Sequence, residues 1–354
     1  MNIAKQDKRI ALFCLTPGGV KLARKLRKRI PLQCYTSTTL QELGFDSFGT
    51  RFVDCVQAAY HRFDALIIIG ATGIAVRVLA PVIKDKLSDP AVVVLDEKGQ
   101  FVISLLSGHV GGANALARKI ASITEGQAVV TTATDVNKVA ALDTLASQMN
   151  ATMKQFRQTV KKVNQWLVSD KPVGIWWHPD LRHEQAAYDL SGFTLVESLD
   201  ALPPLTALIV VSYRNDRYSL SVPVFQLIPR RVVAGIGCRK NSEEMLVAEL
   251  FTHHLKANAI HPLAVYAIGS ITLKAKEPAL IALARDYQAH FQIYSAEALS
   301  SAAANFPTSP FVQKTVGVGS VSQPVAWLMS QGRLIGNTCK TQGVTMTLGV
   351  IHSC

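Results

Sequence analysis

Short apolar runs alternate with amphipathic segments over the first 150 residues of the chain. The most apolar run, at residues 65–69, contains one Ala, one Leu and three Ile and ends in the sequence GATG at 70–73. A run of this kind, bounded by glycine, is typical of a buried parallel strand that breaks into a turn. Two further apolar runs, at 91–95 and 101–106, flank the polar sequence DEKG and predict a hairpin-like pair of strands. The second of them leads directly into SGHVGGAN at 107–114, and a helix is predicted to follow.

This alternation of strands and helices predicts an α/β fold in three parts. We expect an N-terminal three-layer α/β domain with a mostly parallel sheet over residues 1–150. A small middle α/β region with weaker periodicity follows at 151–230, and a C-terminal α/β domain at 231–354 returns to the strand, glycine, helix order. Two segments near the end, at 332–340 and 343–351, predict a closing hairpin or two strands at a sheet edge.

The length and charge of the chain narrow the choice of partners. A chain of 354 residues is too long for one ordinary core and predicts two or three domains. A net charge of +12 suits nucleic acid, an anionic membrane surface or a polyanionic small molecule. The densest basic run, KLARKLRKR at 21–29, is interleaved with apolar residues and is explained by the solvated face of a helix. Because aromatic residues make up only 7% of the chain, in no stacking pattern, we expect no nucleic acid partner.

Membrane and metal signals are weak in this sequence. No apolar run approaches the roughly 20 residues that a membrane-spanning helix needs, so we expect no membrane association. The short apolar run near the N-terminus predicts a first strand and not a signal peptide. The six cysteines form no CxxC pair, and no His/Cys spacing or HExxH motif matches a zinc site. We therefore expect a cytoplasmic protein with reduced thiols and no metal site.

Glycine-rich turns that follow the predicted strands carry the candidate binding residues. Exposed backbone NH groups at a helix start suit an anionic ligand, and in a doubly wound sheet such turns gather at the carboxyl ends of the strands. The candidates from these turns are Gly70, Thr72, Gly73, Arg77, Ser107, Gly108, His109, Gly111, Gly112, Asn114, Gly237, Cys238, Arg239, Lys240, Ser270, Lys274, Glu277, Gly319 and Ser320. A nucleotide is weakly supported, because no Walker pattern or complete dinucleotide fingerprint is found.

Several of these residues have two interpretations. His109 is either a general acid or base, the common role of histidine near neutral pH, or a side chain that only hydrogen-bonds its own turn. Cys238 stands beside two cations, but no His or Asp lies nearby in sequence, which favours a packed residue over a nucleophile. Lys274 and Glu277 form either an ion pair within a helix or, if buried in a cleft, a cation and a base.

At these residues the sequence resembles the cobalt-precorrin-5A hydrolase family of the anaerobic cobalamin pathway. The sequences GATGIAVR and SLLSGHVGGANALA resemble the N-terminal domain of the family. The sequences VVAGIGCRK, IGSITLKAKE, VGVGSVSQPVA and VTMTLGVI resemble its C-terminal domain, so that the resemblance covers nearly the whole chain. One departure is Gln323, which stands where the family usually carries an acidic residue.

The resemblance implies a reaction. Water opens the δ-lactone of cobalt-precorrin-5A, a ring-contracted tetrapyrrole, and a two-carbon fragment leaves as acetaldehyde to give cobalt-precorrin-5B. The substrate carries the cobalt, so no cofactor is expected, and the partners are this anionic cobalt-tetrapyrrole and neighbouring enzymes of the pathway. The alternative is a non-catalytic carrier of a corrinoid intermediate.

The reaction suggests roles for the candidate residues. Our hypothesis makes His109 the general base, with Ser107 and nearby NH groups holding the lactone oxygen, and Glu277 the second candidate base. Four cations would bind the substrate carboxylates: Arg77, Arg239, Lys240 and Lys274.

Overall fold

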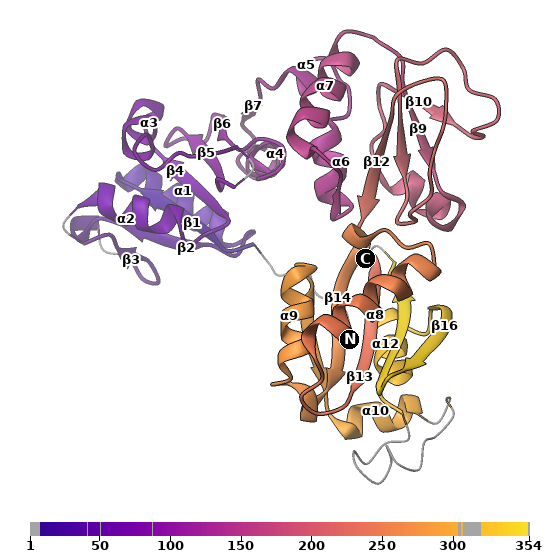
Figure 1. The fold of residues 1–354 in the computed structure, drawn as a ribbon. Coiled ribbons are helices and arrows are strands. Elements are labelled where there is room, and N and C mark those ends of the chain that lie inside the picture. The colour runs from indigo at the N-terminus through magenta and orange to yellow at the C-terminus, as the bar shows by residue number, and fades with distance from the viewer. Residues whose placement is uncertain are drawn as a thin grey trace. The chain divides into compact units, whose positions relative to one another are not determined.

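The computed structural model describes residues 8–40, 42–49, 51–86, 88–303, 306 and 320–352 (Figure 1). The chain forms two compact units, Met1–Thr144 and Leu145–Cys354. The first unit holds one sheet and the second holds two, so the predicted α/β class is confirmed. None of the helices in the described ranges has the length and apolar character needed to cross a membrane.

The first unit is built on a seven-stranded sheet with the order β3-β2-β1-β4-β5-β6-β7. Its strands are β1 Ile10–Cys14, β2 Gln33–Thr36, β3 Asp46–Ser47, β4 Ala65–Ile69, β5 Ala91–Leu95, β6 Phe101–Leu106 and β7 Gln127–Val129. Its helices are α1 Pro17–Arg27, η1 Thr38–Leu40, α2 Phe52–Tyr60, α3 Thr72–Leu79, α4 Ala113–Thr124 and α5 Ala133–Val136, and α6 Leu142–Gln148 spans the border to the second unit.

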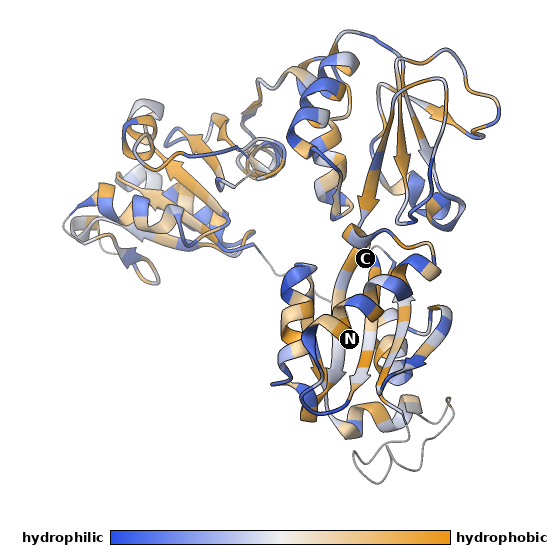
Figure 2. Ribbon diagram, viewed as in Figure 1, coloured by the Kyte–Doolittle hydropathy of each residue, from blue (hydrophilic) through white to orange (hydrophobic). Residues whose placement is uncertain are grey.

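Alternate side chains of the central strands enter two different cores. Ile67 and Ile69 of β4 pack with α1 and α4 on one face of the sheet, whereas Leu66 and Ile68 pack with α2 and α3 on the other. All four side chains are almost completely buried, and each contributes about 1.5–3 kcal/mol relative to an exposed position. Burial on both faces explains why β4 is a continuous apolar run, and it confirms the three-layer N-terminal arrangement (Figure 2).

The direction of β6 corrects the prediction about the two glycine-rich turns. β5 and β6 pair antiparallel, with Leu95 opposite Val102 and Val92 opposite Leu106, while β4 and β5 run parallel. The turn after β4 therefore lies at the carboxyl edge of the parallel strands, and the turn after β6 lies at their amino edge. The prediction that both turns gather at one edge is wrong, because a hairpin reverses the strand that carries the second turn.

The second unit contains two five-stranded sheets with the orders β10-β9-β11-β12-β8 and β15-β14-β13-β17-β16. Their strands are β8 Ala151–Thr152, β9 Val173–Trp177, β10 Phe193–Val196, β11 Ala207–Val211, β12 Val224–Pro229, β13 Val232–Cys238, β14 Val265–Ile271, β15 His290–Tyr294, β16 Leu334–Thr341 and β17 Val344–Val350. The helices are α7 Phe156–Val168, η2 Pro179–Ala187, α8 Glu244–Ala257, η3 Pro262–Ala264, η4 Thr272–Lys274, α9 Pro278–Asp286, α10 Ala296–Ala303 and α12 Ser322–Ser330.

Two glycines in this unit serve helix packing. Gly235 lies within β13, and a Cβ atom there would stand 2.0 Å from the carbonyl oxygen of Ser322 in α12. At Gly269 in β14 a Cβ atom would stand 2.5 Å from the sulfur of Met329. Gly237 was predicted to belong to a glycine turn, but it lies within β13, which continues to Cys238.

Candidate active site

The turn between β6 and α4 has a constrained backbone. Ser107 has a positive φ of 54°, which a residue with a side chain rarely adopts, and Gly112 has a φ of 88°. The turn is closed by hydrogen bonds from the Ala113 amide to the Ser107 carbonyl (3.1 Å) and from the Asn114 amide to the Gly108 carbonyl (3.0 Å). This backbone holds His109 in a fixed position just before the helix.

His109 lies between two carboxylates. Its Nδ1 is 3.3 Å from Oδ2 of Asp143, and its Nε2 is 3.1 Å from Oδ2 of Asp135 and 3.0 Å from the Thr134 hydroxyl. The hydrogen bond to Asp143 is the main factor that raises the pKa of His109; burial opposes the shift and Asp135 adds to it. The geometry therefore favours an imidazolium that donates from both ring nitrogens, and it gives the predicted general base no unoccupied nitrogen.

Asp135 is the centre of a wider hydrogen-bond network. Its carboxylate accepts from Asn114 Nδ2 at 2.9 Å and also from the Thr132 hydroxyl and the Arg118 guanidinium. Burial acts to raise the pKa of Asp135, but the hydrogen bonds from Thr132, Arg118 and His109 outweigh it and lower the pKa. Asn114 also accepts from the Ser104 hydroxyl at 2.7 Å, so this buried amide connects β6 to the network.

Ser107 has a polar atom without a partner. Its hydroxyl is shielded from solvent and makes no hydrogen bond to any residue that the structure describes. Gly111 leaves room for this side chain, because a Cβ atom at Gly111 would stand 2.5 Å from the Ser107 Cβ. A strained backbone and an orphan hydroxyl in one residue are features that cluster at functional sites.

A cavity of about 490 Å³ adjoins this turn at the amino edge of the sheet. Val110 and Gly111 line it together with Lys8, His61 and Lys84, and the Lys8 ammonium donates to the Gly111 carbonyl at 2.7 Å. No motif in the sequence marks these cations or the two aspartates around His109. They lie far from the turn in sequence, and no local motif connects them.

The turn after β4 lies at the other edge. Its Gly73 and Arg77 are exposed, Thr72 and Gly70 are partly buried, and the Gly70 amide donates to the Leu95 carbonyl at 2.9 Å. The ends of β1 and β4 flank the point where the strand order reverses, which is the usual ligand position in open α/β sheets. The predicted residues of the first unit are therefore divided between two edges of one sheet.

In the second unit, Glu277 is buried and its carboxylate has two partners. Its Oε1 accepts from the Ser242 amide at 3.0 Å and its Oε2 from the Lys274 ammonium at 2.8 Å. The Glu277 side chain is only 4% exposed. The pair connects η4 to the residue that precedes α9, so it does not lie within one helix.

Cys238 lies close to this pair. Burial is the main factor that raises the pKa of the Cys238 thiol; Lys274 lowers it and Glu277 raises it. The thiol is therefore not activated as a nucleophile, which agrees with its interpretation as a packed residue. Arg239 and Lys240 follow Cys238 and are exposed, as carboxylate binders need to be.

The remaining predicted residues of this unit are less accessible to a ligand. Ser270 is fully buried and its hydroxyl donates to the Ile236 carbonyl at 2.7 Å, while the Gly237 carbonyl accepts from the Thr345 hydroxyl at 3.3 Å. Both contacts are internal to the sheet. Ser320 is partly buried, and Gly319 lies outside the described residues.

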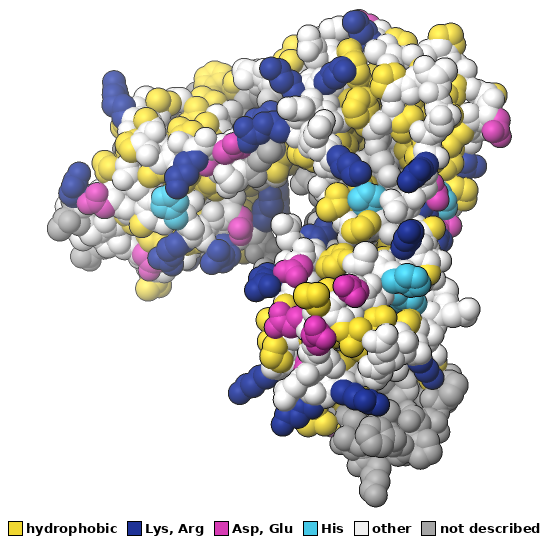
Figure 3. Space-filling view, viewed as in Figure 1, with side chains coloured by type: hydrophobic (Ala, Val, Ile, Leu, Met, Phe, Trp, Pro, Cys, Tyr) yellow, Lys and Arg dark blue, Asp and Glu magenta, His cyan; other side chains and the backbone are white. Residues whose placement is uncertain are grey.

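Lysine and arginine side chains are dispersed over the face drawn in Figure 3, among carboxylates and apolar side chains.

Three consecutive regions of the chain match known protein families. Residues 54–135 match the family described as Cobalamin synthesis G N-terminal, 140–229 the Cobalamin biosynthesis central region, and 232–349 the Cobalamin synthesis G C-terminus. The cobalt-precorrin-5A hydrolase of Salmonella typhimurium is 56% identical over 352 residues, covering 99% of this chain and 100% of that protein. The enzyme of the same name from Priestia megaterium is 29% identical over 359 residues, with 96% and 94% covered.

A solved structure of a cobalamin biosynthesis protein G homologue from Sulfolobus solfataricus aligns over 97% of each chain, with 20% identity and a TM-score of 0.40. The three family regions occur in order and the relatives are matched over almost their whole length. The chain belongs to the cobalamin biosynthesis protein G family.

Proposed function

We propose that the protein is a hydrolase of cobalamin biosynthesis that converts cobalt-precorrin-5A to cobalt-precorrin-5B with release of acetaldehyde. The observation that carries this proposal is the 56% identity, over the full length of both chains, to a protein named cobalt-precorrin-5A hydrolase. The cobalt enters with the substrate, and the reaction as proposed needs no resident cofactor. We place the protein in the cytoplasm with other enzymes of the pathway as partners.

The reaction needs water activation, stabilisation of an oxyanion, and a proton acceptor. Water adds to the lactone carbonyl and the ring oxygen leaves as a hydroxyl group. The hydroxyl then loses its proton as the carbon–carbon bond breaks, acetaldehyde departs, and the electron pair passes to the macrocycle. The protein must therefore hold negative charge on oxygen twice and accept a proton at least once.

The His109 cluster fits these needs. The raised pKa of His109 favours a cation beside the turn, and the Ser107 hydroxyl, which has no hydrogen-bond partner among the described residues, can donate to an oxyanion. Asp135 and Asp143 are carboxylates beside the cation and are the candidates to take the proton of the attacking water. The role of His109 as the general base stays a prediction, and it requires that one ring nitrogen be released when substrate binds.

Each unit carries cations that suit the carboxylates of the substrate. Lys8 and Lys84 line the cavity beside the His109 turn together with Asp64 and Asp89, while Arg239 and Lys240 are exposed in the second unit. Lys274 already neutralises Glu277, so we assign it less weight as a carboxylate binder. A cavity of about 490 Å³ is within the usual size of ligand pockets and would hold part of a tetrapyrrole.

The test is to incubate the purified protein with cobalt-precorrin-5A and measure acetaldehyde with a coupled dehydrogenase. We expect release of one acetaldehyde per substrate, together with formation of cobalt-precorrin-5B. Tight binding of the substrate with no acetaldehyde would contradict the hydrolase and support the carrier.

A further inference from the structure

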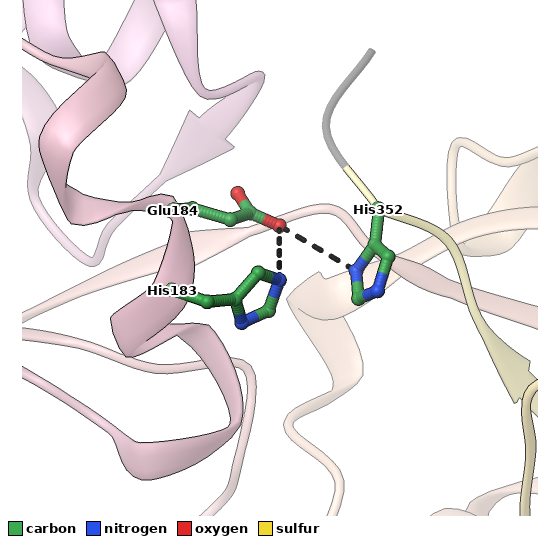
Figure 4. A group of neighbouring side chains, drawn as sticks. All are labelled: His183, Glu184 and His352. Atoms are coloured by element: carbon green, nitrogen blue, oxygen red, sulfur yellow. Dashed lines mark ion pairs between the residues drawn. The ribbon is translucent and has the colours of Figure 1, made fainter.

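Three side chains of the second unit point toward one another, two from neighbouring residues and one from a residue far away in the sequence. His183 and Glu184 lie on η2, and His352 follows β17 (Figure 4). Oε1 of Glu184 is 3.9 Å from Nε2 of His183 and 3.8 Å from Nδ1 of His352. The candidate ligand atoms of all three residues lie within 4.8 Å of one another.

The protein fixes this arrangement from two sides. The Ile351 amide donates to the Arg231 carbonyl at 2.9 Å, which places the residue before His352 next to β13. The Arg231 guanidinium donates to Oε2 of Glu184 at 3.2 Å, and both side chains are nearly completely buried. The arginine thus orients the carboxylate so that its other oxygen, Oε1, faces the two imidazoles.

The spacing of the three groups suits a shared cation better than direct hydrogen bonds. Separations of 3.8 and 3.9 Å exceed the hydrogen-bond range, and Nδ1 of His352 is shielded from solvent with no hydrogen-bond partner among the described residues. Two ligand atoms on a tetrahedral zinc ion, each about 2.0–2.1 Å from the metal, stand about 3.4 Å apart. Coordination would therefore shorten the two distances from Glu184 by about 0.5 Å and bring the two imidazole nitrogens, which lie within 4.8 Å of each other, to a similar separation.

We propose that His183, Glu184 and His352 bind one divalent transition-metal ion of the zinc type. Two imidazole nitrogens and one carboxylate oxygen form a common zinc ligand set, and the fourth position would hold water. The His183 side chain is 52% exposed, so an ion can enter from its side, while the 3% exposed Glu184 anchors the site. This site does not depend on the proposed hydrolysis, whose cobalt belongs to the substrate.

The experiment uses the full chain, stripped of metal with a chelator and titrated with Zn²⁺ by calorimetry. We expect one high-affinity ion per chain, and His352→Ala and His183→Ala should each weaken binding by at least about tenfold. His253, an exposed histidine on α8, provides the matched control, and His253→Ala should bind as the wild type does. Glu184→Gln is less informative because it also disturbs the buried Arg231.

Co²⁺ gives a second readout that does not depend on affinity. Bound to the wild type, it should show the strong visible bands of a four- or five-coordinate ion, and these bands should be lost in His352→Ala. The proposal is overturned if the wild type binds no stoichiometric Zn²⁺, or if both histidine variants bind it as tightly as His253→Ala does. Circular dichroism of His352→Ala checks that the variant is folded, so that a loss of metal binding reflects the missing ligand and not unfolding.

Discussion

The predicted site residues include a buried charged cluster in each unit, and the two clusters differ in how completely their groups are paired. In the second unit both oxygens of Glu277 already accept hydrogen bonds, and the side chain is 4% exposed. In the first unit His109 is 17% exposed, and the neighbouring Ser107 hydroxyl has no partner in the described structure. A fully satisfied buried pair is best explained as a structural connection, whereas an incompletely satisfied network is a candidate for chemistry.

The largest expected effect concerns His109. Replacing the cation with His109→Ala should reduce kcat for acetaldehyde release by about 10²–10⁴-fold, the range for a group that acts in the transition state. Steady-state kinetics on cobalt-precorrin-5A measure this, with His253→Ala as the control. If the variant keeps more than half of the wild-type kcat, His109 has only a structural role in its turn.

The pH dependence separates the two roles of His109. Its pKa is raised, so the imidazolium persists above the ordinary value of about 6.5 and is lost as pH rises through the higher value. If the cation is the working form, kcat falls about tenfold per pH unit above that point. If neutral His109 acts as a general base, kcat should instead rise with pH below the pKa of His109. Protonated His109 also stabilises the folded state at low pH, and this stabilisation is lost as the pH rises through the raised pKa of His109.

Glu277→Gln should act mainly on stability. The substitution leaves the mostly buried Lys274 without its counter-ion, while a glutamine oxygen can still accept from the Ser242 amide. We expect a loss of about 1–3 kcal/mol in the free energy of unfolding. Urea denaturation measures it, with the exposed Glu249→Gln on α8 as the control. A kcat loss as large as that of His109→Ala, at unchanged stability, would make Glu277 the base.

Two substitutions distinguish the edges of the N-terminal sheet. Lys84 lines the cavity beside the His109 turn, whereas Arg77 on α3 belongs to the turn at the other edge. We expect Lys84→Ala to raise KM about tenfold, the effect of one charged hydrogen bond, and Arg77→Ala to raise it less. The reverse order would place the substrate carboxylates at the switch point between β1 and β4.

Cys238→Ala should have the smallest effect. Burial raises the pKa of this thiol, so the thiolate is scarce near neutral pH, and a change in kcat of less than about twofold is expected. Thiol alkylation of the wild type should likewise proceed slowly at this position. Rapid modification of Cys238 with loss of activity would show that the thiol is reactive.

The sequence by itself determined the elements and the layers of this protein. The apolar run of β4 and the hairpin of β16 and β17 follow from local sequence patterns, because burial on one or two faces imposes a repeat that the chain must carry. The resemblance to the family is likewise carried by short motifs that occur in order along the chain.

Only the tertiary structure decided which side chains share a site. The antiparallel pairing of β6 moved the His109 turn to the opposite edge from GATG, and residues 26 and 34 positions away supplied its two carboxylates. The same applies to His183, Glu184 and His352, which no spacing motif connects. The periodicity of the sequence indicates which side of an element is buried. The neighbours of each residue depend on strand direction and on the path of the chain between elements, and both are decided by contacts between residues distant in sequence.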